Sequence, residues 1–223
     1  MTPAPLHLGP ERFMLDPLGA LFWPAQGALI VADLHLEKGS AAAVRGSLVP
    51  PWDTHATLEK LAALLRRWSP RQVVALGDSF HDRHGSTRLM QADAARLAGM
   101  TAQVPFTWVL GNHDPAPQAG IAGTVAEEWH AAGIAFRHQA LPAASGEVSG
   151  HFHPKATVQT RGGALTRPCF MTDAGRIVLP PLGAYTGGLD VRNPALARLF
   201  PRGGRAFLLG RDRLFSFPVA PGR

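Results

Sequence analysis

The chain has 223 residues, which is enough for one large domain with a well-buried core. Hydrophobic residues make up 46% of the chain and charged residues 17%, and these values exclude a disordered or fibrous protein. Proline, glycine and arginine interrupt every apolar stretch before it reaches the ~18 residues of a membrane span. The opening MTPAPLHLGPERFML lacks the basic start and apolar core of a secretory signal, and Cys169 is the single cysteine. We therefore expect a cytoplasmic protein without disulfides.

The formal charge is +6, and the excess lies near the carboxyl end of the chain. Residues 161–223 contain ten arginines and three aspartates. Guanidinium groups grip phosphate well, so this distribution suits a polyanionic partner. Arginine greatly outnumbers lysine, however, and alanine, glycine and proline are abundant, which is also typical of a genome-wide compositional bias. Charge alone leaves nucleic-acid binding open.

Strands and helices alternate over the first two thirds of the sequence. A turn-linked strand pair is expected within residues 13–35. Apolar segments typical of buried strands occur at residues 28–33, 72–78, 105–112, 134–138 and 147–153. Helices are expected between them at residues 54–68, 87–98 and 124–133, the first capped by Thr54 and the last closed by Gly133.

The last third reads mainly as β-structure. Short apolar segments without helices of comparable length occur at residues 169–172, 176–180, 205–210 and 213–218. This order of elements predicts an α/β fold in which strands form two stacked sheets. No linker is evident, so we expect one domain over residues 1–223, with a β-rich part from 155 to 223.

Polar side chains follow five successive strands at the point where each strand ends. They are Asp33 and His35, Asp78 and His81, Asn112 and His113, His138, and His151 and His153. Ligands gather outside the carboxyl ends of strands in open α/β sheets. Each piece alone is weak evidence, because a lone histidine is more often a surface residue. Together, and without any thiolate, they indicate a site for Mn²⁺, Fe²⁺ or Zn²⁺.

The number of ligands suits two metal ions. Two cations about 3.5–4 Å apart repel unless an anion lies between them, so one carboxylate must bridge. Asp78 is the expected bridge, because it is central in the order and follows a glycine. We expect the remaining ligands to divide into two sets: Asp33, His35 and His153 for one ion, and Asn112, His138 and His151 for the other.

The series D-x-H, G-D-x-x-H, G-N-H-D, H and G-H-x-H resembles the calcineurin-like metallophosphoesterase superfamily. The resemblance covers about residues 28–154 and implies a four-layer α/β/β/α sandwich, two mixed sheets flanked by helices. We expect His138 to match the isolated histidine of the series. The other histidines between Asn112 and His151 are His113 and His130.

A finer resemblance covers nearly the whole chain. The segments DLHLEKGSAAAVRGSLVP, GDSFHD, GNHD, SGHFHP and LPPLGAYTGGLDVRNPAL are similar to the bacterial ligase-associated DNA-damage-response endonucleases. This resemblance implies a nuclease in DNA repair, associated with an ATP-dependent DNA ligase and a helicase. Single- or double-stranded DNA would be the substrate. Assembly into a homo-oligomer stays open.

The resemblance implies phosphodiester hydrolysis by a hydroxide that two metal ions activate, with Mn²⁺ expected first and Fe²⁺, Zn²⁺ or Ni²⁺ as alternatives. His113 would protonate the leaving group or stabilise its charge, and Asp114 would orient His113. His81 matches a position that contacts substrate in repair nucleases. Further substrate contacts are expected from Lys38, Arg45 and Tyr185.

Two other readings stay open. The first is a phosphodiesterase or phosphatase of the same superfamily that acts on a small molecule such as a cyclic nucleotide. The second is a catalytically inactive scaffold, which the full ligand set argues against. Among the tryptophans, Trp52 in PPWD is expected to be exposed and able to stack on a base, whereas the others and Cys169 are expected in the core.

Overall fold

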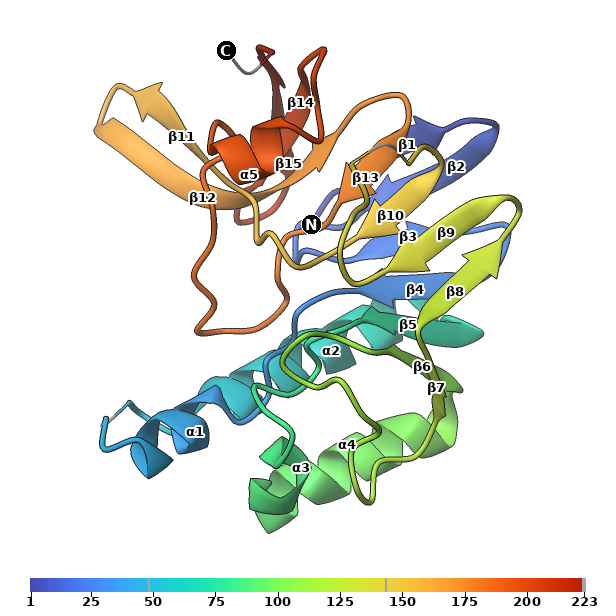
Figure 1. Cartoon of the computed structure of the whole chain (residues 1–223), viewed down its shortest axis with the longest axis vertical. Coiled ribbons are helices and arrows are strands. Elements are labelled where there is room, and N and C mark those ends of the chain that lie inside the picture. Colours follow the sequence, from blue (N-terminus) through green and yellow to red (C-terminus); the bar gives the residue numbers. More distant parts are fainter. Residues whose placement is uncertain (48, 143, 222–223) are drawn as a thin grey trace.

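Two β-sheets stack face to face in the computed structural model, and most of the helices cover the outer face of one sheet (Figure 1). The structure describes residues 1–47, 49–142 and 144–221. Gly222 and Arg223, the end of the predicted domain, lie outside the described residues, as do Leu48 and Ala143. The predicted α/β class with two stacked mixed sheets is confirmed.

The first sheet has seven strands in chain order: β1 (Ala4–Leu8), β2 (Glu11–Leu15), β3 (Leu21–Trp23), β4 (Ala28–Val31), β5 (Gln72–Leu76), β6 (Phe106–Val109) and β7 (Thr124–Ala126). Strands β1 to β4 pair antiparallel, whereas β4, β5, β6 and β7 pair parallel. The carboxyl ends of β4, β5 and β6 therefore meet at one edge of this sheet.

The connections between the parallel strands carry the helices: α1 (Lys38–Val44), α2 (Asp53–Trp68), α3 (Gly85–Arg88) and α4 (Gln91–Gln103). In Figure 1, α2 and α4 lie below the first sheet, and α1 projects at the lower left. Leu58, Leu61 and Leu64 are spaced along one face of α2 and are fully buried against the sheet.

The second sheet has the order β15-β14-β12-β13-β10-β9-β8, and β11 pairs with β12 outside this path. Its strands are β8 (Glu128–Ala131), β9 (Ile134–Arg137), β10 (Glu147–Ser149), β11 (Lys155–Thr160), β12 (Gly163–Thr172), β13 (Arg176–Val178), β14 (Gly204–Leu209) and β15 (Leu214–Val219). Strands β9, β10 and β13 pair parallel. The short helix α5 (Pro194–Ala197) packs on the outer face of this sheet through Leu196.

Side-chain alternation in β4 and β5 explains the layers. Ala28 and Ile30 point into the core between the two sheets, while Leu29 and Val31 point into the core beneath the helices. Successive residues of a strand face opposite sides, so an uninterrupted apolar strand serves two cores. No helix within the described ranges is both long and apolar enough to cross a bilayer.

The predicted helix at residues 124–133 is wrong. The segment forms β7 and then β8, which pairs antiparallel with β9. Ala132 and Gly133 both have a positive φ, 48° and 75°, as the two central residues of a tight hairpin turn require. Strand pairing on both sides therefore overrides the helical propensity of the alanines.

Two smaller expectations about the helices also fail. The predicted helix at residues 87–98 is divided into α3 and α4, because Leu89 and Met90 adopt extended backbone conformations. Thr54 does not cap α2, which begins at Asp53 after Trp52 without a side-chain cap. The Thr54 hydroxyl instead donates to Glu37 and accepts from its backbone N–H. Residues 13–35 contain β3 and β4 after the end of β2, one strand more than the expected pair.

Candidate metal centre

Loops at the carboxyl ends of β4, β5, β6, β9 and β10 bring the expected polar residues together. The first three strands belong to one sheet and the other two to the second sheet, so the site lies where the two sheets meet. The side chains that converge there are those of Asp33, His35, Asp78, Asn112, His138, His151 and His153.

One set of ligand atoms comes from Asp33, His35 and His153, and all three lie within 4.8 Å of one another. The Nε2 atoms of His35 and His153 are 3.3 Å apart, and His153 Nε2 is 3.4 Å from Asp33 Oδ1. The Asp33 carboxylate also accepts the backbone N–H of His151 at 2.9 Å. Asp33 therefore fixes the loop that carries the two histidines after β10.

A second set comes from Asp78, His138 and His151, again within 4.8 Å of one another. Asn112 completes this set, because its Oδ1 lies 2.8 Å from His138 Nε2 and 3.0 Å from His151 Nδ1. These two groups contain the residues that the sequence assigns to the two ions, and His35 also groups with His81 and His113, so the assignment of each ligand to an ion stays a prediction.

Asp78 lies between the two sets. Its Oδ2 is 3.7 Å from His35 Nε2 and 3.5 Å from His138 Nε2, one residue from each set. Its Oδ1 accepts the backbone N–H of His113 at 2.9 Å, which holds the carboxylate in this orientation. The close approach requires Gly111, because a Cβ at that position would collide with the backbone nitrogen and Oδ1 of Asp78.

The backbone of the site is unusual. Eight non-glycine residues among those described have a positive φ, and five of them belong to the two ligand sets: Asp33 (52°), His35 (44°), Asp78 (46°), His151 (69°) and His153 (46°). Aspartate and histidine tolerate the left-handed region better than most residues, but they still pay a conformational cost there. The fold therefore holds these ligands in sharp turns.

The hydrogen bonding of His138 tests whether the residues fit a metal. Its Nδ1 lies 3.0 Å from the carbonyl oxygen of Leu76, which only accepts, so Nδ1 carries a proton. Nε2 faces Asn112 Oδ1 at 2.8 Å and Asp78 Oδ2 at 3.5 Å. When Nε2 carries a lone pair, it and the lone pairs of these oxygens repel one another unless a cation lies among them. Imidazole, carboxylate and amide donors suit Mn²⁺, Fe²⁺ or Zn²⁺, so the residues fit a divalent ion.

Burial keeps two of the imidazoles neutral, as metal ligation requires. Burial, reinforced by the neighbouring ring of His153, lowers the pKa of His35 to about 2. Burial also lowers the pKa of His151, with a further contribution from His138. Both rings therefore offer lone pairs at neutral pH without first losing a proton.

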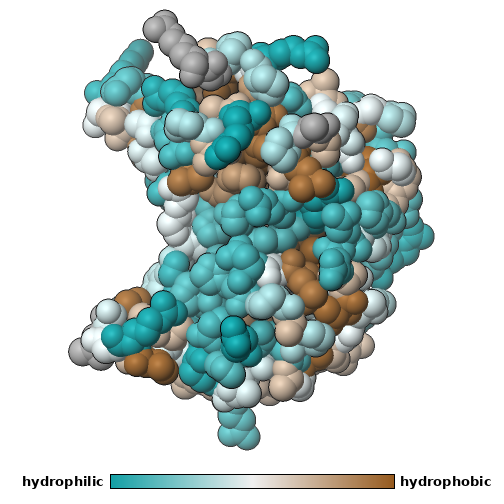
Figure 2. All heavy atoms as spheres, viewed as in Figure 1, coloured by the Kyte–Doolittle hydropathy of each residue, from teal (hydrophilic) through white to brown (hydrophobic). Residues whose placement is uncertain are grey.

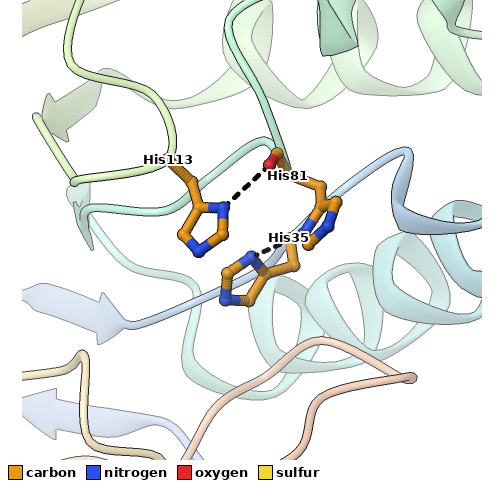
Figure 3. Close-up of side chains that lie close together, drawn as sticks. All are labelled: His35, His81 and His113. Atoms are coloured by element: carbon orange, nitrogen blue, oxygen red, sulfur yellow. Dashed lines mark hydrogen bonds between the residues drawn. The ribbon is translucent and has the colours of Figure 1, made fainter. Parts of the chain in front are cut away.

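His81 and His113 lie beside His35, and the three rings face one another from three separate loops (Figure 3). His113 Nδ1 is 2.9 Å from the carbonyl oxygen of His81, and their rings stack with centroids 5.0 Å apart. Because the carbonyl only accepts, it fixes a proton on Nδ1 and leaves Nε2 of His113 free. Burial, with the charge of Lys38 and others, lowers the pKa of His81 to about 4.

The structure corrects the expected role of Asp114. Its carboxylate does not orient His113 but accepts the backbone N–H groups of Phe80 at 3.0 Å and Gly111 at 3.2 Å. It thereby links the loops after β5 and β6. Burial raises the pKa of Asp114 to about 6. The orienting position is taken by the backbone carbonyl of His81, and no residue type in the sequence marks such a carbonyl.

The segment that carries Tyr185 packs on the metal-ligand loops at both of its ends. The backbone N–H of Gly183 donates to the carbonyl of Asp33 at 3.1 Å. A Cβ on Gly188 would collide with the backbone oxygen of His153. Tyr185, half-buried, lies between these two anchors, so its segment borders the site.

The site has a buried part, which we call the floor, and an exposed part, which we call the rim. Asp33, His35 and Asp78 are 0%, 4% and 2% exposed, whereas Asn112 and His113 are exposed. Lys38 begins α1 three residues after His35 and is half-buried; Arg45 follows the same helix and is exposed. The site therefore opens to solvent. Figure 2 shows this face hollowed at the left, with hydrophilic residues gathered in its middle.

A family model matches residues 28–170, more than half of the chain, from β4 into β12. Its description is calcineurin-like phosphoesterase. The chain belongs to this family. The protein is therefore a phosphoester hydrolase of a family that uses divalent metal ions, and its aspartate and histidine groups have the arrangement to bind them.

A solved structure supports the same assignment. The nuclease MPE of Pseudomonas putida superposes with a TM-score of 0.74 and 30% sequence identity, covering 96% of this chain and 100% of that chain. The phosphoesterase Yfce from E. coli gives a TM-score of 0.39 and 16% identity, covering 87% of this chain and 99% of that one, too low to carry an argument. A search of curated proteins gives no match.

Proposed function

We propose that this protein is a metal-dependent nuclease that hydrolyses phosphodiester bonds in DNA. The observation that carries the proposal is the pair of ligand sets around Asp78, with Nε2 of His113 free at the exposed rim beside them. The role of each residue is part of this proposal. The geometry supports one chemistry, the hydrolysis of a phosphoester whose oxygens contact two cations.

The residues proposed to hold the ions are the two sets described above, with Asp78 shared between them. When bound, the ions lower the pKa of water and neutralise charge on the phosphate. The protein holds the ligands ready for this task, since Leu76 fixes the tautomer of His138 and the His113 amide fixes the Asp78 carboxylate. We propose Mn²⁺ first, with Fe²⁺, Zn²⁺ or Ni²⁺ as alternatives.

His113 is the proposed proton donor. In the protonated ring of this exposed residue, Nδ1 donates to the His81 carbonyl and Nε2 carries the second proton. Transfer of the Nε2 proton to the leaving oxygen leaves a neutral ring whose remaining proton already has its acceptor. We infer that His81 contributes by holding this ring, and that Lys38, Arg45 and Tyr185 contact the phosphates of the substrate.

Several observations favour DNA over a small substrate. The rim of the site is open, and the chain carries a charge of +6. A nuclease has the same fold at 30% identity over nearly the whole chain. Action in DNA repair, association with a DNA ligase and a helicase, and a cytoplasmic location remain proposals that rest on the subfamily resemblance. A single domain is likewise proposed, supported by the core that the two sheets share.

The test uses Mn²⁺-loaded protein with linear single-stranded DNA, linear duplex DNA, circular plasmid and bis(p-nitrophenyl) phosphate. We expect cleavage of DNA, including the circular form if the enzyme is an endonuclease, and a loss of about 10²- to 10⁴-fold in kcat on DNA for His113→Ala. p-Nitrophenolate leaves without a proton, so the small diester should lose much less. Turnover of the small diester alone would favour the small-molecule phosphodiesterase, and failure to bind metal would favour the scaffold.

A further inference from the structure

One tryptophan is exposed where the others are not. Trp52 is 66% exposed, whereas Trp23 and Trp108 are 0% and 7% exposed. It belongs to the arm, which we define as residues 38–47 and 49–53, that is, α1 and the segment leading to α2. Val44 and Val49 on the same arm are also exposed, at 76% and 38%. Burial of this apolar surface against a partner would be favourable.

Hydrogen bonds anchor the beginning and the end of the arm. The buried carboxylate of Asp53 accepts the backbone N–H groups of Lys38 at 2.8 Å and Gly39 at 3.1 Å, which are the first amides of α1. Glu37 and Thr54 hydrogen-bond to each other beside this contact. The carbonyl of Trp52 accepts the first helical bond of α2, from Ala56. The Trp52 backbone is therefore held from both sides while its ring faces solvent.

The arm begins close to the metal centre in the sequence. Lys38 follows His35 by three residues, a separation of at most about 11 Å, and its N–H contacts the residue after Trp52. The Trp52 ring therefore lies within roughly 25 Å of His35. A single strand of a few nucleotides can span this distance. Figure 1 shows α1, the helical part of the arm, at the lower left.

The charge of the arm suits a polyanion. Glu37, which precedes the arm, and Asp53, its last residue, are 6% and 4% exposed and are hydrogen-bonded within the protein. Arg45 is exposed and Lys38 is half-buried, so the charges that the arm offers to a partner are positive. Exposed hydrophobic atoms and hydrophilic atoms lie side by side on this arm in Figure 2.

We propose that the arm binds an unpaired nucleotide of the DNA substrate, with its base stacked on Trp52 and its phosphates near Arg45 and Lys38. The inference rests on the proposed nuclease function and deepens it, because it assigns the enzyme a substrate with a single-stranded segment. A base presents an apolar face and a phosphate presents negative charge, and the arm offers both complements within one segment. A base held in a duplex cannot offer its face to the ring.

The experiment compares two single-stranded oligonucleotides of one length, one with all its bases and one with abasic sites throughout. Binding is measured by fluorescence anisotropy on Mn²⁺-loaded protein carrying His113→Ala to slow cleavage. Protein with Trp52 intact should bind the base-bearing strand about 5- to 150-fold more tightly than the abasic strand, and Trp52→Ala should bind the two alike. Trp52→Phe should keep most of the preference.

Phe215→Ala is the matched control, since Phe215 is an aromatic residue of β15 that is 51% exposed in the other part of the fold. It should leave the preference intact. In the background with His113 present, Phe215→Ala should also hydrolyse bis(p-nitrophenyl) phosphate at the rate of the unmodified protein.

The failures are separable. An unchanged preference for bases in Trp52→Ala, or an equal loss in Phe215→Ala, overturns stacking even if DNA is cleaved. A change in sedimentation of Trp52→Ala with unchanged DNA binding also overturns it and makes a second copy of the chain the occupant. If the base preference depends on Trp52 but no DNA is cleaved, the stacking surface stands and the nuclease proposal fails.

Discussion

The Nε2 atoms of His35 and His153 lie 3.3 Å apart although 118 positions separate the two residues in the chain. His35 follows a strand of the first sheet and His153 follows a strand of the second. The two Nε2 atoms are close enough to hydrogen-bond or to share one cation, and Asp33 Oδ1 lies 3.4 Å from the same His153 nitrogen. Their proximity makes sense as half of a metal site that joins the two sheets, and it makes the occupancy of that site measurable.

Asp78→Asn should lower metal binding with little change to the fold. The amide keeps an oxygen that accepts the His113 N–H but loses the negative charge between the two ligand sets. Two cations then repel without a bridging anion. We expect two Mn²⁺ per unmodified chain, no more than one per Asp78→Asn chain, and a loss of about 10³-fold or more in kcat.

Metal content after gel filtration, measured by elemental analysis, checks this prediction. His130→Ala is the control, because the His130 side chain is 64% exposed and pairs with Glu128 away from the site. It should retain both ions. Two tightly bound ions in Asp78→Asn would show that Asp78 is not shared.

Gly111→Ala should destabilise the protein and disturb the site, because the added Cβ overlaps the backbone and carboxylate of Asp78. Overpacking of this kind costs about 1–3 kcal/mol. Gly99→Ala is the matched control: Gly99 lies inside α4, where a Cβ meets no atom within 4 Å. That change should stabilise by about 0.5–1 kcal/mol through helix propensity.

Urea unfolding of the metal-free proteins gives both free energies. Opposite signs for the two substitutions are the expected result. Equal effects would mean that the loop after β6 can move away from Asp78 at little cost, which would contradict the tight contact described here.

Lys60→Met should remove a pH dependence of stability. The ammonium group is half-buried and donates to the Leu182 carbonyl at 3.0 Å, and burial lowers the pKa of Lys60 below its usual 10.5. Between the lowered pKa and 10.5 the unfolded chain binds the proton and the folded chain does not, so this group makes stability rise with pH in that window. Below the window the charged group carries its full burial cost.

The free energy gained by Lys60→Met should therefore be largest near neutral pH and shrink as pH approaches 10.5. Urea unfolding at three pH values between 7 and 10 measures it. Arg66→Met, at an exposed position of α2 whose guanidinium does not titrate in this range, should give a difference independent of pH. A constant difference for Lys60→Met would contradict the prediction.

Local patterns were sufficient for the strands that lead into the site. Apolar runs such as ALIV of β4 and QVVAL of β5 are short, bounded by turn residues, and end just before Asp33 and Asp78. The structure brings together the side chains that the sequence singled out, because residues that follow neighbouring parallel strands reach the same edge. The distribution of these strands over two sheets has no local signature, since it depends on long-range pairing.

Other features could not be predicted from the sequence, because they depend on backbone atoms or on which strands pair with each other. The partner of His113 Nδ1 is the carbonyl of His81, and every residue has a carbonyl. The helix expected before β9 is a strand because β8 and β9 share a hairpin turn at Ala132 and Gly133. The β11–β12 hairpin was also missed, because most of its residues are exposed and carry little apolar periodicity.

The left-handed turns at Asp33, His35, Asp78, His151 and His153 have a cost for the protein as a whole. At roughly 1 kcal/mol for each such residue, these five positions consume several kcal/mol of a total that is about 5–15 kcal/mol in ordinary domains. Glycine at any of them would relax the chain. Laboratory evolution that selects for heat resistance alone would therefore replace these metal-ligand residues first. A selection for thermal stability must be combined with a selection for activity.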